Sequence, residues 1–367
     1  MKVFTTREIL LGPLVAVSGV VERRHKLPIL SNVLIEARGE EFYLSTSDLE
    51  VELQMAVPLV AEELGRTTVS ARKLCGIIRA LPIGAEITLL GRQQQLEIDS
   101  GSSHFRLAML PADDFPSVSE ITEYLELKIE APILSNLIAK TQFAMAQQDV
   151  RFFLNGMLMH FDGENLVAVT TDGHRLALST TALKIPEKKG CQIIVPRKAV
   201  QEMTRLLNDR DEDAVIRIGE NHIQVCIGSQ SLKAKLIDGS FPDYKRSIPG
   251  GGDNVVTINR EQLQQALYRL SILSDEKYKS IKVELSNECL KVSARNPEQE
   301  TAEEEIQANY QGSELVVGFN VTYLLDVLSA ISTDNVVLKL TDPDAGCLII
   351  PDEKSGKDKY VVMPMRL

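Results

Sequence analysis

The sequence predicts an α+β fold in which helices pack on one face of antiparallel sheets, repeated as three similar domains in tandem. The main observation is a β-rich run, followed by a polar helix start and an amphipathic helix, which occurs three times. The three copies, TTVSARKLCGIIRALP, QIIVPRKAVQEMTRLLND and LVVGFNVTYLLDVLSAIS, begin at positions 67, 192 and 315. A second helical segment and several alternating strands accompany each copy.

Further landmarks recur in the same order. Each unit begins with a helical segment, REILLGPLVAVS, APILSNLIAKTQ or REQLQQALYRLS, and closes with an alternating strand, HFRLAML, SLKAKLI or KYVVMPM. Between them, STSDLEVEL, TTDGHRLALS and ARNPEQETAEEE occupy equivalent places. We therefore place three domains at residues 1–120, 121–250 and 251–367, with the glycine-rich PGGGDN as a linker.

The second helix of each unit carries an apolar stripe, and in two units its other side is basic. In the first copy Leu74, Ile77 and Ile78 follow helical spacing, and we expect Pro196 in the first helical turn of the second copy. The basic side carries Arg72, Lys73 and Arg79 in the first copy, and Arg197, Lys198 and Arg205 in the second. The third copy has Thr322, Asp326 and Ser329 there, partly compensated by Arg260, Arg269, Lys277 and Lys279 near its other helix. Such a face is typical of a solvated helix, but its repetition also fits a surface that meets a polyanion.

Composition limits the possible classes of protein. The chain has 367 residues, 44% of them apolar and 25% charged, as in globular proteins with two or three domains. Its five cysteines are scattered without a CxxC pair, so we expect neither a disulfide framework nor a metal site. It lacks a signal peptide and a membrane-spanning run, so we expect a cytoplasmic protein. The net charge of −11 alone argues against nucleic-acid binding, but a net charge hides local basic surfaces.

The segment TTDGHRLALS places Asp172, His174 and Ser179 close together and so raises the possibility of a hydrolase. A catalytic triad is assembled by the fold, however, and proximity in sequence is not its signature. The sequence also has no GxSxG, HExxH or phosphate-binding loop motif. We therefore expect no catalysis and no cofactor. Asp172 and Gly173 should instead form a turn, after which Leu176 and Leu178 alternate into a sheet.

Several long motifs, all in order along the chain, carry a resemblance to a known family. They include LPILSN, TSDLE, AMAQQDVRFFLNGML, TDGHRLA, FPDY, ILSDEKY, NPEQE, GFNVTYLLDVL and YVVMPMRL. Over essentially its whole length the chain resembles the bacterial DNA polymerase III beta subunits, the DNA sliding clamps. The resemblance implies two chains joined head to tail into a ring of six domains. Helices line the hole, duplex DNA passes through it, and the ring tethers polymerase without performing chemistry.

The resemblance implies further partners: DNA polymerase III alpha and other polymerases, the clamp loader, and repair proteins with a clamp-binding motif, all at the nucleoid and none in a membrane. The DNA-facing residues that match the family are Arg24, Arg72, Lys73, Arg79, Gln148, Phe152, Phe153, Arg197, Lys198 and Arg205. Phe152 and Phe153, at the head of a strand, stand where many members have tyrosine. They cannot hydrogen-bond to phosphate, so DNA contact and a place in the core both stay open for them.

The resemblance also implies a hydrophobic pocket between the second and third domains, which receives a short peptide motif from partners. The matching residues are Leu154, Thr171, Gly173, His174, Arg175, Leu176, Pro242, Arg246, Asn320, Tyr323, Val361, Val362, Met363, Pro364, Met365 and Arg366. Methionine and aliphatic side chains suit an adaptable cleft, and Arg175, Arg246 and Arg366 would fix polar groups of the peptide. Ser247 and residues 341–346 depart from the family pattern, which leaves partner preference open. The alternative for VVMPMRL is an ordinary terminal strand.

The implied contact between chains joins the first domain of one copy to the third domain of the other. The matching residues are Phe105, Leu107, Ile272, Leu273, Glu298, Glu300, Glu303 and Glu304. The glutamates would pair with Lys73, Arg92 or Arg106, and the apolar residues should dominate because exposed ion pairs contribute little. The alternative to a clamp is a related scaffold that binds peptides without encircling DNA.

Overall fold

The computed structural model describes residues 1–21, 27–118, 121–184, 190–250, 252, 254–275, 277–353 and 356–366. Its contacts divide the chain into two compact units, residues 1–135 with 198–236, and residues 136–197 with 237–367. The middle repeat of the sequence contributes to both units.

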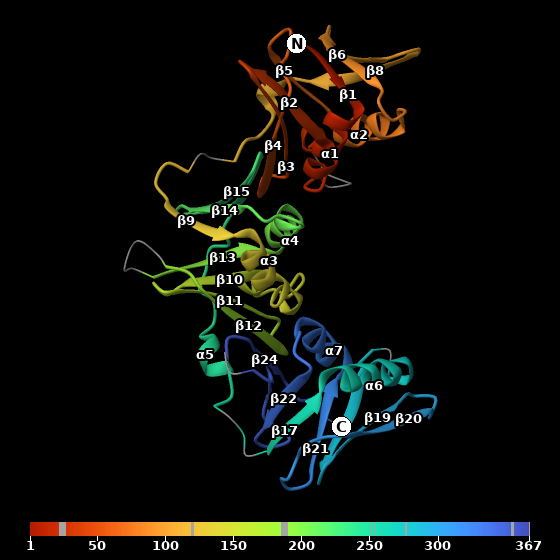
Figure 1. The fold of residues 1–367 in the computed structure, drawn as a ribbon, viewed down its shortest axis with the longest axis vertical. Coiled ribbons are helices and arrows are strands. Elements are labelled where there is room, and N and C mark those ends of the chain that lie inside the picture. Colours follow the sequence, from red (N-terminus) through yellow and green to blue (C-terminus); the bar gives the residue numbers. More distant parts are fainter. Residues whose placement is uncertain are drawn as a thin grey trace. The chain divides into compact units, whose positions relative to one another are not determined.

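The first unit is built on an antiparallel sheet of twelve strands (Figure 1). In spatial order the strands are β1 (Lys2–Thr6), β6 (Glu86–Arg92), β7 (Gln95–Ser100), β8 (Ser103–Leu110), β5 (Gly65–Ser70), β2 (Asn32–Arg38), β3 (Glu41–Ser47), β4 (Val51–Val57), β16 (Gln230–Lys235), β15 (His222–Ile227), β14 (Asp213–Ile218) and β9 (Leu125–Glu130). The sheet joins strands of the first repeat to strands of the second because β4 pairs with β16.

Helices α1 (Arg7–Val17) and α2 (Ala71–Ala80) pack together against the first-repeat part of this sheet. The Ser70 side chain accepts a hydrogen bond from Lys73 N at 3.4 Å and so caps the start of α2. The helix ends at Ala80, and Leu81 after it is extended because Pro82 follows. Leu74 and Ile78 are buried, as the apolar stripe predicts, whereas Arg72, Lys73 and Arg79 are exposed.

Helix α3 (Ala131–Ala139) begins the second repeat, and α4 (Arg197–Leu207) follows β13 (Cys191–Pro196). The placement of Pro196 in the first helical turn is wrong. Pro196 ends β13 and pairs with Gly156 in the sheet, and the helix begins one residue later. At the end of the strand, the proline ring restricts the backbone directly before the first residue of the helix.

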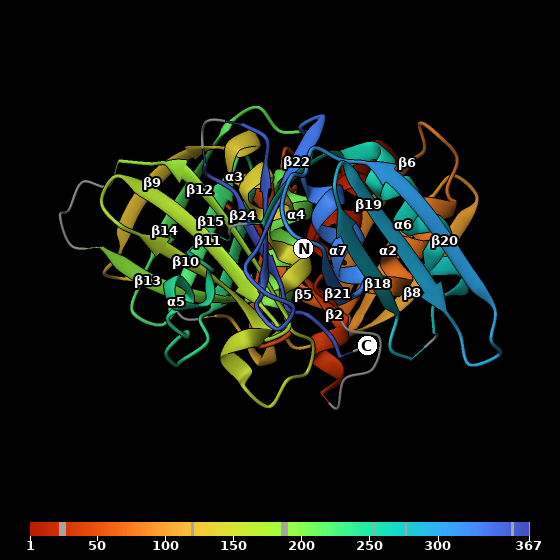
Figure 2. The ribbon, with the colours of Figure 1, turned by 90° about the horizontal axis from the view of Figure 1, so that it is seen from below.

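The second unit contains an eight-stranded and a four-stranded antiparallel sheet. The larger one has the order β13, β10 (Gly156–Phe161), β11 (Asn165–Thr171), β12 (Arg175–Ala182), β24 (Lys359–Val362), β23 (Cys347–Pro351), β22 (Asn335–Leu340) and β17 (Asn254–Asn259). The smaller one has the order β20 (Thr301–Gln307), β19 (Cys289–Arg295), β18 (Ser280–Ser286) and β21 (Leu315–Asn320). Figure 2 shows β20 at the outer edge of this sheet, beside β19.

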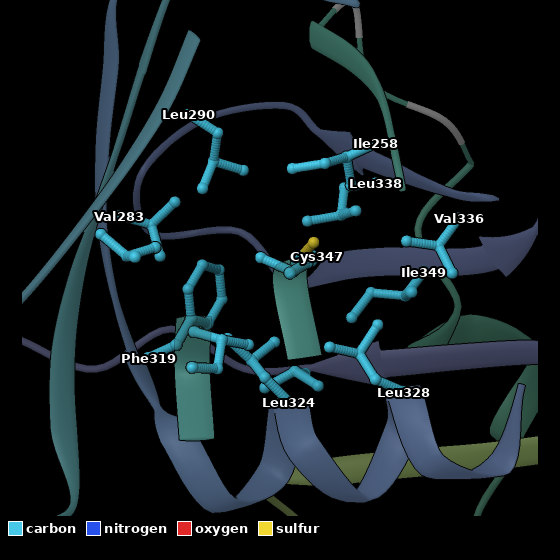
Figure 3. Close-up of a cluster of buried hydrophobic side chains, with 14 of the residues drawn as sticks. Ile258, Val283, Leu290, Phe319, Leu324, Leu328, Val336, Leu338, Cys347 and Ile349 are labelled. Carbon is cyan, nitrogen blue, oxygen red and sulfur yellow. The ribbon is translucent and has the colours of Figure 1, made fainter. Parts of the chain in front are cut away.

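Two long helices, α6 (Arg260–Leu273) and α7 (Val321–Ala330), pack against each other in the second unit, and α5 (Tyr244–Ser247) is a single turn. Short 3-10 turns lie at η1 (Pro28–Ser31), η2 (Ala112–Asp114), η3 (Gln142–Ala144) and η4 (Phe152–Asn155). Side chains of both sheets meet α7 in one apolar core, where Phe319, Leu324 and Cys347 lie close together (Figure 3). A cavity of about 20 Å³ in this core is lined by apolar side chains. All five cysteines are free, and burial raises the pKa of Cys347 to about 12, which leaves that thiol inert.

Candidate partner-binding pocket and basic helix faces

The TTDGHRLALS segment forms a turn followed by β12, as the sequence predicts. Asp172 Oδ1 accepts hydrogen bonds from His174 N at 2.9 Å and from Arg175 N at 3.0 Å. Gly173 has a φ of +89°, and a Cβ atom there would lie 3.0 Å from Arg151 Nη2. The turn therefore requires glycine both for its backbone conformation and for the space that Arg151 occupies.

Ser179 lies within a buried polar network and cannot act as a nucleophile. Its hydroxyl donates to Asp358 Oδ1 at 2.6 Å, and Lys140 Nζ contacts the other oxygen of the same carboxylate at 2.6 Å. Ser179 and Asp358 are each only 3% exposed. Because Asp172 serves the turn and Ser179 pairs with Asp358, the three residues do not form a catalytic triad.

Leu176 and Leu178 lie on one buried face of β12, as the sequence predicts, and the opposite face of the strand is buried as well. Leu176 and Leu178 belong to one apolar cluster, and Ala177, between them, belongs to the core on the other side. The strand lies between β11 and β24 in the eight-stranded sheet, and both sheet faces are covered. An apolar run without alternation is typical of such a strand.

Arg175 is almost enclosed by protein, with 11% of its side chain exposed. Its guanidinium pairs with Asp172 and Asp326, and Nη2 donates to the Phe143 carbonyl at 2.9 Å. It also lies 4.5 Å from the centre of the Tyr323 ring. The sequence led us to expect Arg175 to bind a peptide directly, but these contacts give it the task of holding β12, α7 and the η3 turn together.

The apolar residues predicted for the pocket come together in the second unit. Leu154, Leu176 and Val361 are buried in one cluster, together with Phe241, Tyr244 and Leu348. Val362, the neighbour of Val361 on β24, is buried in the core on the opposite face of the sheet. Pro242 and Arg246 are exposed beside this cluster, and Arg246 forms an ion pair of 3.1 Å with Asp243.

The C-terminal segment after β24 is held by two backbone hydrogen bonds. Met363 N donates to the His174 carbonyl at 2.8 Å, and Met365 N donates to the Gly318 carbonyl at 2.8 Å. Met363 is 41% exposed, Pro364 and Met365 are half-buried, and Arg366 is exposed. The terminal residues therefore form a fixed, partly apolar surface next to the His174 turn, and not the end of a regular strand.

Gly346 and Pro249 also lie at this surface, and no role in the pocket was predicted for either. A Cβ atom on Gly346 would lie 3.0 Å from a methyl group of Val361 and 3.2 Å from the Met363 sulfur, and Pro249 lies next to it. Gly346 belongs to the segment 341–346 that departs from the family pattern, and its lack of a side chain leaves room for Met363.

The other predicted residues support the rim of the pocket. Asn320 caps α7 by accepting a hydrogen bond from Thr322 N at 2.9 Å, and the His174 ring stacks on the Tyr323 ring with 6.4 Å between their centres. Thr171 Oγ1 donates to the Arg175 carbonyl.

The predicted DNA-facing cations differ in their surroundings. Arg72, Lys73 and Arg79 are exposed on α2, and the Arg205 side chain is 64% exposed while it pairs with the buried Glu202. Lys198 pairs with Asp48, and Arg197 donates to the Met145 carbonyl at 2.9 Å. Burial lowers the pKa of Arg197 from its usual value, with a smaller effect from Arg175. Arg24 lies outside the described residues.

Gln148, which the resemblance places among the DNA-facing residues, is exposed. Gln148 has a φ of +55°, and Arg151 pairs with Asp149, which lowers the pKa of that carboxyl to about 2. Phe152 and Phe153 lie on the η4 turn before β10, so their placement at the head of a strand is wrong. Phe152 is 56% exposed, whereas Phe153 packs against the apolar cluster. The two rings meet edge to face at 5.8 Å.

The residues predicted to join two chains lie on β8, α6 and β20. Ile272 is 71% exposed, Leu273 and Phe105 are half-buried, and Leu107 is buried. Within the chain, Glu303 pairs with Lys291 at 2.8 Å, Glu304 with Arg269 at 2.6 Å, and Arg106 with Glu97 at 3.2 Å. Glu298 and Glu300 are exposed near the start of β20. The charges of Glu303, Glu304 and Arg106 are therefore already balanced within one chain.

Among the described residues, no group of three or more His, Cys, Asp or Glu side chains is arranged to hold a metal ion. In the same part of the chain, no helix has both the length and the apolar character needed to cross a bilayer.

Comparison with known proteins assigns the family. The N-terminal, central and C-terminal domain profiles of the DNA polymerase III beta subunit match residues 1–119, 128–243 and 245–366. The chain is 48% identical to the beta sliding clamp of Pseudomonas aeruginosa over 362 residues, 98% of each chain, and 43% identical to that of Escherichia coli K12 over the full length of both. A crystal structure of the Pseudomonas aeruginosa beta subunit matches with a TM-score of 0.96 at 48% identity over both whole chains, and one bound to griselimycin matches with 0.95. The chain therefore belongs to the DNA polymerase III beta subunit family, the bacterial DNA sliding clamps.

Proposed function

We propose that two copies of this sliding clamp join head to tail through β8 and β20, encircle duplex DNA, and receive partner peptides at the pocket of the second unit. As a member of its family the chain is a non-catalytic processivity factor for DNA polymerase III. The observation that carries the proposal is a pair of strand edges. At the two junctions between repeats, the equivalent edges are buried within the chain.

The strand that closes each repeat pairs with the strand that follows the Asp172-type turn of another repeat. Within the chain β16 pairs with β4, and β24 pairs with β12. The third pair of equivalents is β8 and β20. Among the described residues, β8 pairs along Ser103–Ala108 with β7, and reaches β5 through Met109 and Leu110. β20 is the edge strand of its sheet. One chain thus leaves one edge of each kind for a second copy.

The pairing of β4 with β16 within the chain also suggests which residues of β8 and β20 would face each other between two copies. Val51, Arg175 and Thr301 are the first residues of β4, β12 and β20. A residue with positive φ precedes each of them, at +80° for Leu49, +89° for Gly173 and +71° for Gln299.

The other strand of the junction is aligned in the same way. Leu107 and Ala234 are both buried near the ends of β8 and β16, so we take Leu107 as the equivalent of Ala234. Ala234 pairs with Val51. By equivalence, Leu107 would lie opposite Thr301 of the second copy, and Arg106 opposite Ala302.

The exposed cations of α2 and α4 would meet the phosphates of the enclosed duplex. Arg72, Lys73 and Arg79 support this proposal most strongly because they are exposed on one helix. The remaining proposed contacts are Arg24, Gln148, Phe152, Phe153, Arg197, Lys198 and Arg205. Contacts to phosphate carry no sequence information, so they allow the ring to slide. The whole chain has a net charge of −11, so its acidic residues elsewhere would repel DNA from other surfaces.

The pocket of the second unit would bind a short peptide of polymerases, and in the finer proposal also of the clamp loader and of repair proteins. Leu154, Leu176 and Val361 would form its floor, and Met363 an adaptable side. Arg246 and Arg366, which are exposed, would bind polar groups of the peptide, while Arg175 would keep the floor in place. We propose the cytoplasm, at the nucleoid, as the place of action.

A loading experiment tests the proposal against the alternative of a scaffold that encircles no DNA. The clamp is loaded onto a nicked circular plasmid by clamp loader and ATP, purified from free protein, and the plasmid is then cut once. A clamp remains on the circle and leaves the linear ends. Protein that never co-purifies with the circle, although it binds clamp-motif peptides, would support the scaffold instead.

A further inference from the structure

We propose that the first unit holds a second peptide site, the charged pocket, which is built on the same plan as the pocket of the second unit but takes a charged segment of a partner. Its ligand is an extended peptide with a basic and an acidic side chain on one face. The proposal rests on the proposed function, since the pocket of the second unit is its template.

The pairing of strands equates the centres of the two pockets. Glu52 is the second residue of β4 and pairs with Lys233 of β16. Leu176 is the second residue of β12 and pairs with Val361 of β24. Because the two strand pairs are equivalent, the charged pocket has a carboxylate and an ammonium group where the pocket of the second unit has Leu176 and Val361.

The neighbouring strands show the same equivalence. Leu34 of β2 pairs with Ser45 of β3, and Leu158 of β10 pairs with Val169 of β11. Leu158 and Val169 both belong to the apolar cluster of the second unit, whereas the first unit keeps the leucine and has a serine in place of the valine. A sheet face that is apolar in the second unit is thus partly polar in the first.

The first unit is hollow at this place. Leu34 and Ser45, together with the charged pair, line a cavity of about 430 Å³. Phe115 lines it as well, and it begins a Phe-Pro pair like that of Phe241, which belongs to the apolar cluster of the second unit. The volume lies within the usual range of ligand sites, about 300–1,000 Å³.

Four other charged residues line this cavity and are paired with one another. Arg38 Nη2 lies 2.6 Å from Glu36 Oε1, and Arg66 pairs with Asp113. The side chains of Arg38 and Arg66 are 63% and 53% exposed, so the two cations lie at the mouth of the cavity. These four charges are already balanced without a ligand.

Glu52 and Lys233 are the charged groups that remain for a ligand. Glu52 is only 7% exposed and accepts a hydrogen bond from Val118 N at 2.7 Å. Within the part of the chain that the structure describes, neither Glu52 nor Lys233 forms an ion pair. Burial raises the pKa of Glu52, so its ionised form is poorly solvated although Lys233 is near, and a cation from a ligand would stabilise it.

This pair favours a ligand that carries both signs of charge. An apolar side chain placed on it would cover a carboxylate and an ammonium group without giving either a partner, which is costly. A peptide cation facing Glu52 and a peptide carboxylate facing Lys233 would satisfy both groups. In an extended peptide the side chains of residues i and i+2 lie on one face, so the spacing Arg-x-Glu presents the two charges together.

Isothermal titration calorimetry of the full chain tests the charged pocket with the blocked peptide acetyl-Gly-Arg-Gly-Glu-Gly-amide. We expect the wild type to bind one such peptide per chain, and Glu52→Leu with Lys233→Val to weaken the binding by about tenfold or more. Glu50→Leu with Lys235→Val is the matched control, because it makes the same changes at two exposed residues outside the cavity and should leave the affinity unchanged. No binding to the wild type, or equal affinity of all three proteins, would overturn the proposal.

A clamp-motif peptide provides the converse test and separates this proposal from the proposed function. The wild type should bind one per chain, whereas Glu52→Leu with Lys233→Val should bind two, because both cavities then have a leucine and a valine at their centre. A double variant that still binds one would show that these two residues do not set the selectivity, which would also overturn the proposal. A wild type that binds none would refute the pocket of the second unit, and the Arg-x-Glu peptide would still decide whether the charged pocket exists.

Discussion

Arg175 provides the sharpest test of how the pocket is built, because the change of one side chain should act on stability and on peptide binding together. In Arg175→Ala, the Phe143 carbonyl and the carboxylates of Asp172 and Asp326 lose a shared partner. A hydrogen bond to a charged group contributes roughly 1.5–3 kcal/mol, and removal of one member of a buried ion pair costs roughly 3–5 kcal/mol.

The expected cost lies toward the lower end of these ranges. The side chains of Asp172 and Asp326 are 17% and 37% exposed, so water partly replaces the guanidinium, and Asp172 keeps its two backbone donors. We expect Arg175→Ala to destabilise the second unit by about 3 kcal/mol, which lowers its melting temperature by roughly 6–12 °C. The melting temperature of Arg175→Lys should lie between those of the wild type and Arg175→Ala, because an ammonium group cannot reproduce the fork of donors.

Differential scanning calorimetry of the full chain, together with fluorescence anisotropy of a labelled clamp-motif peptide, measures both effects. Arg151→Lys is the matched control. It lies beside the same turn and pairs with Asp149, but its side chain is 50% exposed, so the change should barely move the melting temperature. If Arg175→Ala melts no earlier than this control and binds peptide normally, Arg175 does not hold the pocket together.

The remaining predictions concern a buried hydroxyl, a buried carboxyl, the tail and the interface between copies. Ser179→Ala should destabilise the chain by about 1–2 kcal/mol, because Asp358 loses a donor, and neither it nor His174→Ala should change any hydrolase background; turnover that both changes abolish would contradict this. Glu52 accepts a hydrogen bond from Val118 N at 2.7 Å, and burial raises its pKa above the usual 4.5, so its favourable contribution is present below pH 4.5 and is lost as the pH rises through the folded-state pKa. Glu52→Gln should therefore melt later than the wild type at pH 8 and equally at pH 4, and an earlier melting at pH 8 would refute this. Removal of residues 363–367 should abolish binding of clamp-motif peptides while the dimer mass stays the same, and retained affinity would refute the pocket. Ile272→Ala with Leu273→Ala should give monomers by light scattering, and an unchanged dimer would place the interface elsewhere.

The threefold pattern of helices and strands could be predicted from the sequence because it rests on local periodicity. The stripe of α2 is an example, since Leu74 and Ile78 are buried and Arg72 and Lys73 are exposed. At β12 the predicted face is buried through Leu176 and Leu178, and a second core covers the other face as well. The same reasoning failed at Pro196 and Phe152, where a strand end and a 3-10 turn have no periodic signal.

The arrangement of the pocket depends on contacts between residues far apart in the chain, which spacing alone cannot supply. The pairing of β12 with β24 brings Leu176 opposite Val361, and the carboxylate of Asp326 reaches Arg175 across 151 positions. Positional resemblance named many of these residues, and it gave Arg175 the role of fixing the peptide. It did not indicate that the carboxylates of Asp172 and Asp326 occupy the guanidinium, and it marked Gly346 only as part of a segment that departs from the family pattern.

The central claim is that two copies form a ring around DNA, closed by β8 and β20. A disulfide cross-link between β8 of one copy and β20 of the other tests this claim most directly. Arg106→Cys with Ala302→Cys places two thiols opposite each other in the proposed register, at a separation that a disulfide can bridge. The clamp is loaded onto a nicked circular plasmid and then oxidised. We expect a dimer cross-linked at both of its interfaces, which stays on the circle in denaturant and is released when the plasmid is cut. The wild type, treated in the same way, controls for the five native cysteines. Failure to form the covalent dimer, or its release from intact circles in denaturant, would contradict the account.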